Sequence, residues 1–351
     1  MGNAISFPGL GLTFDPPEVA FSVLGYNIRW YGIIIAVGFM LAFIYGMKRC
    51  EKFGFNQDQL IDMLFVATPA AIIGARAYYV IFNFHEFESD PARIFQIWNG
   101  GLAIYGAVIF GLLAASITAR VKKIKIGAAL DLGALGFLIG QAVGRWGNFI
   151  NREAYGVATN LPWRMEIYDR AMGMRIAVHP TFLYESLWNV LGFILLHFAS
   201  RKRRYDGQTF LTYIAWYGLG RGLIEGLRTD SLYLFGTGLR VSQVLGFASC
   251  LAALLILGYN ALFRQFDPEN LQYARYMKLK GDNAADLSES REENGATGNS
   301  LSADGQTEPD RNTDNVKMPM PEELSEPLNE PEGKTESGTE NDTSSDPDNK
   351  S

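Results

Sequence analysis

The stretch GLAIYGAVIFGLLAASITA, residues 101–119, contains no charged residue and is long enough to cross the apolar interior of a membrane as one helix. Six further segments have similar length and apolar content, with glycine and other small residues throughout, which favours close helix packing in lipid. The seven predicted spans are residues 30–47, 60–82, 101–119, 128–150, 181–199, 208–226 and 240–262. The sequence therefore predicts an all-α, polytopic membrane protein.

The net charge of −6 averages two regions of opposite sign. Residues 281–351 contain 19 acidic and 5 basic side chains, whereas residues 1–280 contain 18 acidic and 26 basic ones. The 281–351 segment has no aromatic residue and, apart from threonines, a single β-branched one, so it cannot bury enough apolar surface to offset the entropy cost of ordering. We predict a disordered acidic tail, either a solubilising appendage or an interaction segment. An amphipathic cytoplasmic connector, residues 266–280, would join it to the membrane-embedded domain, residues 1–265.

Basic residues concentrate in alternate connections between the predicted spans, which indicates the cytoplasmic side. These connections contain Lys48, Arg49 and Lys52, then Arg120, Lys122, Lys123 and Lys125, and then Arg201, Lys202, Arg203 and Arg204. The opposite connections contain no lysine, although residues 151–179 include four arginines. The use of arginine and not lysine in this connection favours bidentate hydrogen bonding of a guanidinium group to phosphate or carboxylate. We therefore predict an external N-terminus and a cytoplasmic C-terminus.

Cysteine and histidine usage argues against metal and disulfide chemistry. Cys50 and Cys250 lie near the ends of predicted helices and have neither metal-binding nor redox spacing. The three histidines are not closely spaced, so we expect no metal site. We expect no cleavable signal before the first helix, because residues 1–20 lack a basic region followed by a short apolar core, and we expect the first helix to direct membrane insertion. No nucleic-acid partner is expected.

Three arginines, Arg76, Arg145 and Arg221, lie inside predicted spans. Ionisable groups in the membrane interior are costly and indicate a functional site by default. At about 1.5 Å per residue, they lie roughly 24, 26 and 20 Å along their helices from the cytoplasmic ends. That depth is the outer part of a hydrocarbon core about 30 Å thick, near the glycerol and phosphate groups of the outer leaflet. The alternative is that each arginine simply reaches outward to water.

Arg145 lies within the unusual segment GRWGNFINREAYG, residues 144–156. The glycines allow another backbone or a lipid headgroup to approach closely, and Arg145 and Asn148 share one helix face. Glu153 and Tyr155 follow where the chain leaves the membrane. We interpret this segment as a compact polar pocket.

The sixth predicted span contains a second polar stripe. Tyr217, Arg221 and Glu225 recur at intervals of four residues and therefore lie on one helix face. An internal Arg221–Glu225 ion pair is the simpler explanation, but a pair alone does not account for Tyr217 or for the Arg228 and Asp230 that follow.

Six motifs occur in order along the chain. They are RWYG (29–32), GARAYYV (74–80), NGGLAIYGAVIFG (99–111), GRWGNFINREAYG (144–156), HPTFLYE (179–185) and YGLGRGLIEGLRTD (217–230). Together they resemble the bacterial prolipoprotein diacylglyceryl transferase family over about residues 15–265. The fourth motif is long and specific, whereas the others are individually weaker. The acidic tail lies outside the resemblance.

The resemblance implies an enzyme that moves the diacylglyceryl group of phosphatidylglycerol to the lipobox cysteine thiol of a preprolipoprotein. Glycerol phosphate would be released at the outer face of the bacterial plasma membrane, and no cofactor is implied. Residues 1–265 would form the catalytic domain within the membrane lipids. Guanidinium donors suit this reaction because charge builds on the leaving oxygen and because a positive field favours the attacking thiolate.

The resemblance also implies roles for individual residues. Arg145 would bind the lipid phosphate, and Arg221 would be a second essential cation. The predicted catalytic residues are Arg145, Arg221, Tyr105, Asn148, Glu153 and Glu225, and the predicted substrate-binding residues are Arg145, Tyr31, Arg76, Asn151, Gly156 and Tyr217.

The general base is left open by the sequence. The family often carries a histidine, regarded as a candidate base, where this chain has Tyr105. A phenol is a poor base at neutral pH unless cations lower its pKa, so Tyr105 could instead orient the substrate. Glu153 and Glu225 are the carboxylate alternatives, and His179 is better explained as a cap or loop anchor.

The main alternative function is a transporter or flippase for an anionic lipid or metabolite, because such proteins also place arginines in the membrane. Those folds commonly show repeated halves with interrupted helices near the midplane, and this sequence shows no repeat. A scaffold for secreted chains is a third possibility, but it does not account for the buried charges.

Overall fold

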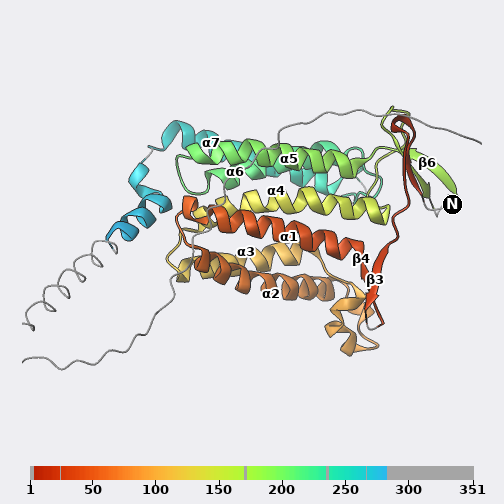
Figure 1. Cartoon of the computed structure of the whole chain (residues 1–351), viewed down its shortest axis with the longest axis horizontal. Coiled ribbons are helices and arrows are strands. Elements are labelled where there is room, and N and C mark those ends of the chain that lie inside the picture. Colours follow the sequence, from red (N-terminus) through yellow and green to blue (C-terminus); the bar gives the residue numbers. More distant parts are fainter. Residues whose placement is uncertain (1–3, 24, 170–171, 235–236, 266, 283–351) are drawn as a thin grey trace, which may run out of the picture. The chain divides into compact units, whose positions relative to one another are not determined.

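The computed structural model describes residues 4–23, 25–169, 172–234, 237–265 and 267–282, so nearly all of the predicted tail lies outside the described residues. Seven long helices cover the seven predicted segments (Figure 1). They are α1 (Trp30–Arg49), α2 (Gln57–Phe82), α3 (Ile104–Val121), α4 (Ile126–Asn151), α5 (Thr181–Ala199), α6 (Gln208–Glu225) and α7 (Val241–Phe263). The shorter 3-10 helices are η1 (Pro8–Leu10), η2 (Cys50–Phe53), η3 (Phe84–Glu86), η4 (Pro91–Phe95), η5 (Ile97–Asn99), η6 (Ser200–Lys202) and η7 (Pro268–Asn270).

Six of these helices, all except α6, are long and apolar enough to cross a membrane. The prediction of seven qualifying spans therefore needs correction, because the 208–226 segment is helical but too polar. Arg221 and Glu225 lower its hydropathy, and its partners explain why it tolerates them, since α6 packs against α4, α5 and α7. A helix enclosed by other helices can carry charge that a lipid-facing helix cannot.

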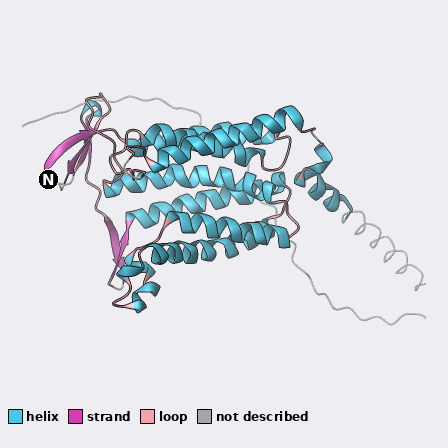
Figure 2. Cartoon of the chain, turned by 180° about the vertical axis from the view of Figure 1, so that it is seen from behind, coloured by secondary structure: helices cyan, strands magenta, loops and turns pink. Residues whose placement is uncertain are grey.

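Two small β-sheets correct the all-α prediction. Their strands are β1 (Ile5–Phe7), β2 (Leu12–Phe14), β3 (Val19–Val23), β4 (Tyr26–Arg29), β5 (Met165–Asp169) and β6 (Met174–Val178), paired in the orders β2-β1-β5-β6 and β3-β4, all antiparallel. Figure 2 shows both sheets at the same end of the helices. Connections outside a helix must still pair their backbone polar groups, and these segments do so as strands. Strands this short do not produce the long apolar runs from which the helices were predicted.

The larger sheet packs on the helix ends through an apolar face. Ile5 and Ile167 are completely or almost completely buried, and they belong to a cluster with Phe149 of α4 and Phe182 of α5. The sheet therefore holds the end of α4 against the start of α5.

Helix α4 lies between α1 on one side and α5 and α6 on the other (Figure 1). Small residues allow the close approaches that the sequence suggested. A methyl group on Gly106 of α3 would lie 2.2 Å from the Gly74 carbonyl oxygen of α2, and one on Gly218 of α6 would lie 2.5 Å from the Gly246 carbonyl oxygen of α7. Any side chain larger than hydrogen at these glycines would separate the helices of each pair. In lipid, helices associate mainly through such close van der Waals packing, because the hydrophobic effect does not drive them together.

The buried carboxylate of Asp131 has a structural role at the other end of the helices. It accepts hydrogen bonds from the backbone N–H groups of Gly207 (2.9 Å) and Phe210 (2.8 Å), at the start of α6. The Arg203 guanidinium lies 3.9 Å away and stacks over the Phe53 ring. A carboxylate here caps the helix and complements its dipole.

We predict that Asp131→Ala will destabilise the protein by about 3–5 kcal/mol, because it removes the α6 cap and one of the two buried carboxylates near Arg203, leaving Asp206 at 4.0 Å. Thermal unfolding in detergent, followed with a thiol-reactive dye, measures this because Cys50 and Cys250 are both buried. Asp62→Ala is the control, since Asp62 forms an exposed pair with Lys122 worth at most about 1 kcal/mol. Equal unfolding temperatures for the two variants would contradict the structural role of Asp131.

The connector after α7 is fixed to the turns between helices. Residues 272–282 are helical, and Gln272 is buried. Its backbone N–H donates to Asp206 (2.8 Å), its side-chain N–H donates to the Gly54 carbonyl (3.1 Å), and its side-chain oxygen accepts from the Lys125 N–H (3.2 Å). One glutamine therefore joins three interhelical turns to the connector.

Candidate active site

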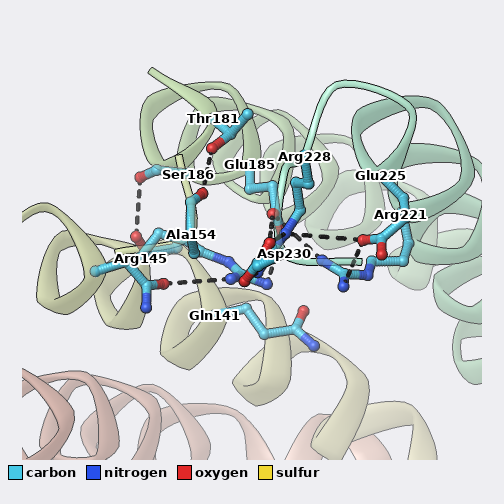
Figure 3. Close-up of polar contacts among 12 residues, drawn as sticks. Gln141, Arg145, Ala154, Thr181, Glu185, Ser186, Arg221, Glu225, Arg228 and Asp230 are labelled. Atoms are coloured by element: carbon cyan, nitrogen blue, oxygen red, sulfur yellow. Dashed lines mark hydrogen bonds and ion pairs between the residues drawn. The ribbon is translucent and has the colours of Figure 1, made fainter. Parts of the chain in front are cut away.

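The end of α4, the start of α5 and the end of α6 meet at one buried carboxylate, Glu185. Arg145 of α4 forms an ion pair with it, and the Arg221 Nη1 atom of α6 lies 3.4 Å from its Oε1 atom. Figure 3 shows these side chains converging from separate helices. Two of the three arginines that the sequence placed at one depth therefore share a partner.

Glu225 and Arg228 complete the group. Glu225 is 1% exposed and lies 2.6 Å from the Arg221 Nη2 atom. Arg228, in the loop after α6, lies 3.3 Å from Glu185 and 3.8 Å from Glu225, and it also pairs with Asp230 at 2.7 Å. We call Arg145, Glu185, Arg221, Glu225 and Arg228 the arginine–glutamate cluster (Figure 3).

Accessibility differs between the cations and the anions of this cluster. The side chains of Arg145, Arg221 and Arg228 are 21%, 18% and 10% exposed, whereas those of Glu185 and Glu225 are 5% and 2% exposed. Buried carboxylates thus hold the guanidinium groups in place while part of each cation stays accessible. Because Asp230 also pairs with Arg228, three carboxylates balance the three arginines, and the guanidinium N–H groups that stay accessible suit an anion with oxygen acceptors.

Two side chains align α4 and α5 beside the Arg145–Glu185 pair. Ser186 donates to the Ala142 carbonyl oxygen (2.8 Å) and accepts a hydrogen bond from the Trp146 indole N–H (3.2 Å). These bonds fix the relative rotation of the two helices, which keeps Arg145 directed at Glu185.

A chain of hydrogen bonds leads from Arg145 to Glu153. Arg145 donates to the Asn148 side-chain oxygen (3.3 Å), and the Asn148 amide donates to Glu153 (2.8 Å). The Asn151 amide donates to the same Glu153 oxygen (3.3 Å). Glu153 itself is exposed. An accessible carboxylate is thus coupled to the cluster through the Asn148 amide, and Asn151 gives it a second hydrogen bond.

The backbone around Glu153 has an uncommon conformation. Arg152 and Ala154, one on each side, both have φ of 56°, in the left-handed region that residues with a Cβ atom rarely adopt. The Thr181 hydroxyl donates to the Ala154 carbonyl oxygen at 2.5 Å. Strain of this kind persists only when surrounding contacts enforce it, and it is common at functional sites.

The segment after α4 also pairs with the segment that carries Arg228. Gly156 forms an antiparallel bridge with Arg228, and the Val157 N–H donates to the Leu227 carbonyl (2.7 Å). A methyl group on Gly156 would lie 2.7 Å from the His179 Cβ atom. Gly156 is therefore needed for close packing that positions Arg228.

Comparison with known proteins identifies the family of this chain. Residues 18–259 match the family model described as prolipoprotein diacylglyceryl transferase. A Clostridioides difficile phosphatidylglycerol–prolipoprotein diacylglyceryl transferase is 41% identical over 238 residues, which cover 68% of this chain and 93% of that protein. The Enterococcus faecalis protein of the same name is 42% identical over 272 residues, 75% of this chain and 95% of that one. The chain belongs to the prolipoprotein diacylglyceryl transferase family.

Membership of this transferase family makes the positions of the remaining predicted residues informative. Tyr31 lies in the first turn of α1, and its ring is so close to α4 that a methyl group on Gly147 would lie 2.6 Å from it. Tyr217 lies one turn before Arg221 and stacks on Tyr213 with 5.8 Å between ring centroids. Both tyrosines thus lie next to the helix turns that carry the cluster arginines.

Arg76 lies elsewhere. Its guanidinium donates to four backbone carbonyls, those of Arg93 (2.5 Å), Ile94 (2.7 Å), Gly100 (2.9 Å) and Gly101 (2.9 Å). These bonds fix the connection between α2 and α3, and none of them involves the arginine–glutamate cluster. In the transferase fold described here, Arg76 acts as a loop anchor.

Tyr105 is also separate from the hydrogen-bonded network. It lies in the first turn of α3, is 51% exposed, and contacts Tyr78 of α2 with 6.2 Å between ring centroids. The network described above joins the cluster to Glu153 through Asn148 without including Tyr105.

Glu185 and Arg228 belong to the cluster but are not among the site residues predicted from the sequence. Glu185 is the acidic residue of the fifth span, and Arg228 follows the 217–225 stripe. The sequence signal for Glu185 is its charge inside an apolar helix. Its position as the partner of three arginines depends on how α4, α5 and α6 pack.

Proposed function

We propose that this chain transfers the diacylglyceryl group of phosphatidylglycerol to the lipobox cysteine thiol of a prolipoprotein at the arginine–glutamate cluster. One observation carries the assignment to this site. Three partly accessible guanidinium groups are held by the buried carboxylates of Glu185 and Glu225 and by Asp230, and Arg145 lies in the most specific motif of the family. The relatives named above are transferases for these two substrates.

The chemistry matches the charge arrangement. The cysteine Sγ atom attacks the glyceryl carbon of the lipid, a C–S bond forms, the C–O bond to the phosphate breaks, and glycerol phosphate leaves. Arg145 and Arg221 stabilise the negative charge on the leaving phosphate through preorganised donors. The buried carboxylates prevent the arginines from repelling one another when no substrate is bound.

Glu153 is the carboxylate best placed to take the thiol proton. It is exposed, and it accepts hydrogen bonds from the amides of Asn148 and Asn151. Glu225 is buried and lies 2.6 Å from Arg221, so it is less accessible to an incoming thiol. A base must come within hydrogen-bond reach of the proton that it removes.

The proposed orientation places the cluster toward the outer leaflet of a bacterial plasma membrane, with the N-terminus outside. The basic turns before α4 and α6 lie at the opposite ends of the helices that carry the cluster. Positive charge in short connections favours the cytoplasmic side, so the cluster end faces outward.

The test uses the purified full-length protein in vesicles that contain labelled phosphatidylglycerol and a lipobox peptide. We expect the label to appear on the peptide, and no transfer to a matched peptide with serine in place of cysteine. Movement of labelled lipid between leaflets without any peptide labelling would support the flippase alternative and contradict the proposed function.

We predict that the double variant Cys50→Ala/Cys250→Ala will retain transfer activity within about twofold, because the nucleophile belongs to the substrate. Both cysteines are buried, and Cys50 donates to the Met47 carbonyl oxygen rather than facing the cluster. The initial rate in the same vesicle assay measures this. Loss of activity in a folded double variant would instead indicate an enzyme-bound covalent intermediate.

A further inference from the structure

A cavity of about 320 Å³ lies at the end of the helices opposite the arginine–glutamate cluster. It lies where α4 and α6 begin and where α7 ends, and the connector closes one side. None of its lining residues belongs to the cluster, so the proposed transfer reaction does not explain it.

Three cations line this cavity: Lys125, Arg204 and Arg264. Lys125 directly precedes the candidate span Ile126–Asn151, and Arg264 directly follows the candidate span Val241–Phe263. Arg204 lies just beyond the end of the span Thr181–Lys202. Residues at the ends of membrane spans lie at the level of lipid headgroups. The cavity therefore collects positive charge from three spans at the headgroup level.

Each of the two carboxylates in the wall accepts one hydrogen bond from the backbone. Asp206 accepts a hydrogen bond from the Gln272 N–H (2.8 Å) and lies 3.7 Å from the Lys125 ammonium group. Asp267 accepts from the Glu269 N–H (3.0 Å) and caps the short helix η7. Lys125 also donates to Asn270. These contacts build the wall and neutralise Lys125.

Arg204 and Arg264 differ from Lys125 in their side-chain partners. Among the residues that the structure describes, no side-chain hydrogen bond or ion pair is found for Arg204 or Arg264. Arg264 is held in place by stacking, since its guanidinium carbon lies 4.8 Å from the centre of the Tyr205 ring. A stacked guanidinium keeps its N–H edges available for a planar or tetrahedral oxyanion. Arg204 and Arg264 thus present N–H donors to the cavity, beside one Asp206 oxygen that has no hydrogen-bond partner among the described residues.

We propose that this cavity binds a phosphate group, with Arg204 and Arg264 as its ligands. The source that the position favours is the phosphodiester headgroup of an anionic membrane lipid, because basic pockets beside membrane spans commonly bind such headgroups. A soluble phosphate compound offers the same chemistry from the aqueous side. In either case the bound anion joins Arg264, directly after α7, to Arg204, which precedes α6.

Hydrogen exchange of the full-length protein in lipid nanodiscs tests the proposal. Backbone amides of residues 264–274 are compared in phosphatidylcholine nanodiscs, in nanodiscs that also contain phosphatidylglycerol, and in phosphatidylcholine nanodiscs with added inorganic phosphate. We expect exchange to slow by about fivefold with the anionic lipid, because the occupied cavity holds the connector closed. Slowing with inorganic phosphate alone would support the soluble source of the same phosphate group.

Two matched double variants separate the cavity from general surface charge. Arg204→Ala/Arg264→Ala removes the proposed ligands and is expected to abolish the slowing. Arg120→Ala/Lys202→Ala removes two exposed cations from the same end of the helices, outside the cavity, and is expected to retain it. No slowing with either probe, or equal slowing in the cavity variant and the wild type, would overturn the proposal. Neither result depends on transfer activity.

Discussion

Arg145→Ala is expected to lower the rate of diacylglyceryl transfer by about a thousandfold, the effect of removing one preorganised donor to a developing oxyanion. The fold should survive, because Glu185 still has Arg221 and Arg228 within 3.4 Å. The initial rate of peptide labelling and the unfolding temperature, measured on one preparation, separate these two effects.

Two further arginine variants sharpen this test. Arg145→Lys keeps the charge but not the fork of donors, so its rate should lie between the wild type and the alanine variant. Arg164→Ala is the matched control, since Arg164 forms a partly exposed pair with Glu166 away from the cluster, and it should stay within about twofold of wild type. Normal transfer by Arg145→Ala would exclude the proposed phosphate site.

Glu185→Gln is expected to impair both stability and transfer. It keeps the size of the side chain but removes the negative charge that Arg145, Arg221 and Arg228 share. Breaking a buried ion pair in this way costs about 3–5 kcal/mol, and the arginines then repel one another. We expect a clearly lower unfolding temperature and a loss of transfer of about a hundredfold or more.

A compensating substitution distinguishes charge balance from packing. In Glu185→Gln/Arg228→Gln, one positive charge is removed together with the negative one, so part of the unfolding temperature should return while transfer stays low. Glu166→Gln, which affects the exposed Arg164 pair, controls for loss of a carboxylate and should be nearly neutral. If Glu185→Gln were as stable as Glu166→Gln, Glu185 would not be the centre of the cluster.

The helices were predictable because apolar run length and small-residue content are local properties. Each predicted segment is helical, and the ends differ by only a few residues. The polar residues of α6 could be read from the sequence as well. The sequence did not show that α6 packs against three other helices. The sheets were missed because strands of three to five residues have no comparable hydropathy signal.

The candidate site was partly predictable for the same reason. Arg145, Asn148 and Glu153 lie within one short segment, so helix geometry and its end determine their proximity. Arg76 lies at a similar predicted depth, yet its donors turn toward backbone carbonyls of the 83–103 connection. Depth along a helix follows from residue number, whereas the direction of a side chain follows from the rotation of the helix against its neighbours.

By itself, the sequence determined that this is a multi-pass membrane protein with charged residues placed at one level inside its helices. Only the tertiary structure decided that Glu185 and Arg228 join Arg145 and Arg221, that Arg76 does not, and that Asp131 caps a helix. The physical reason is that an ion pair needs atoms within a few ångströms, and packing of elements distant in sequence decides which charges come that close.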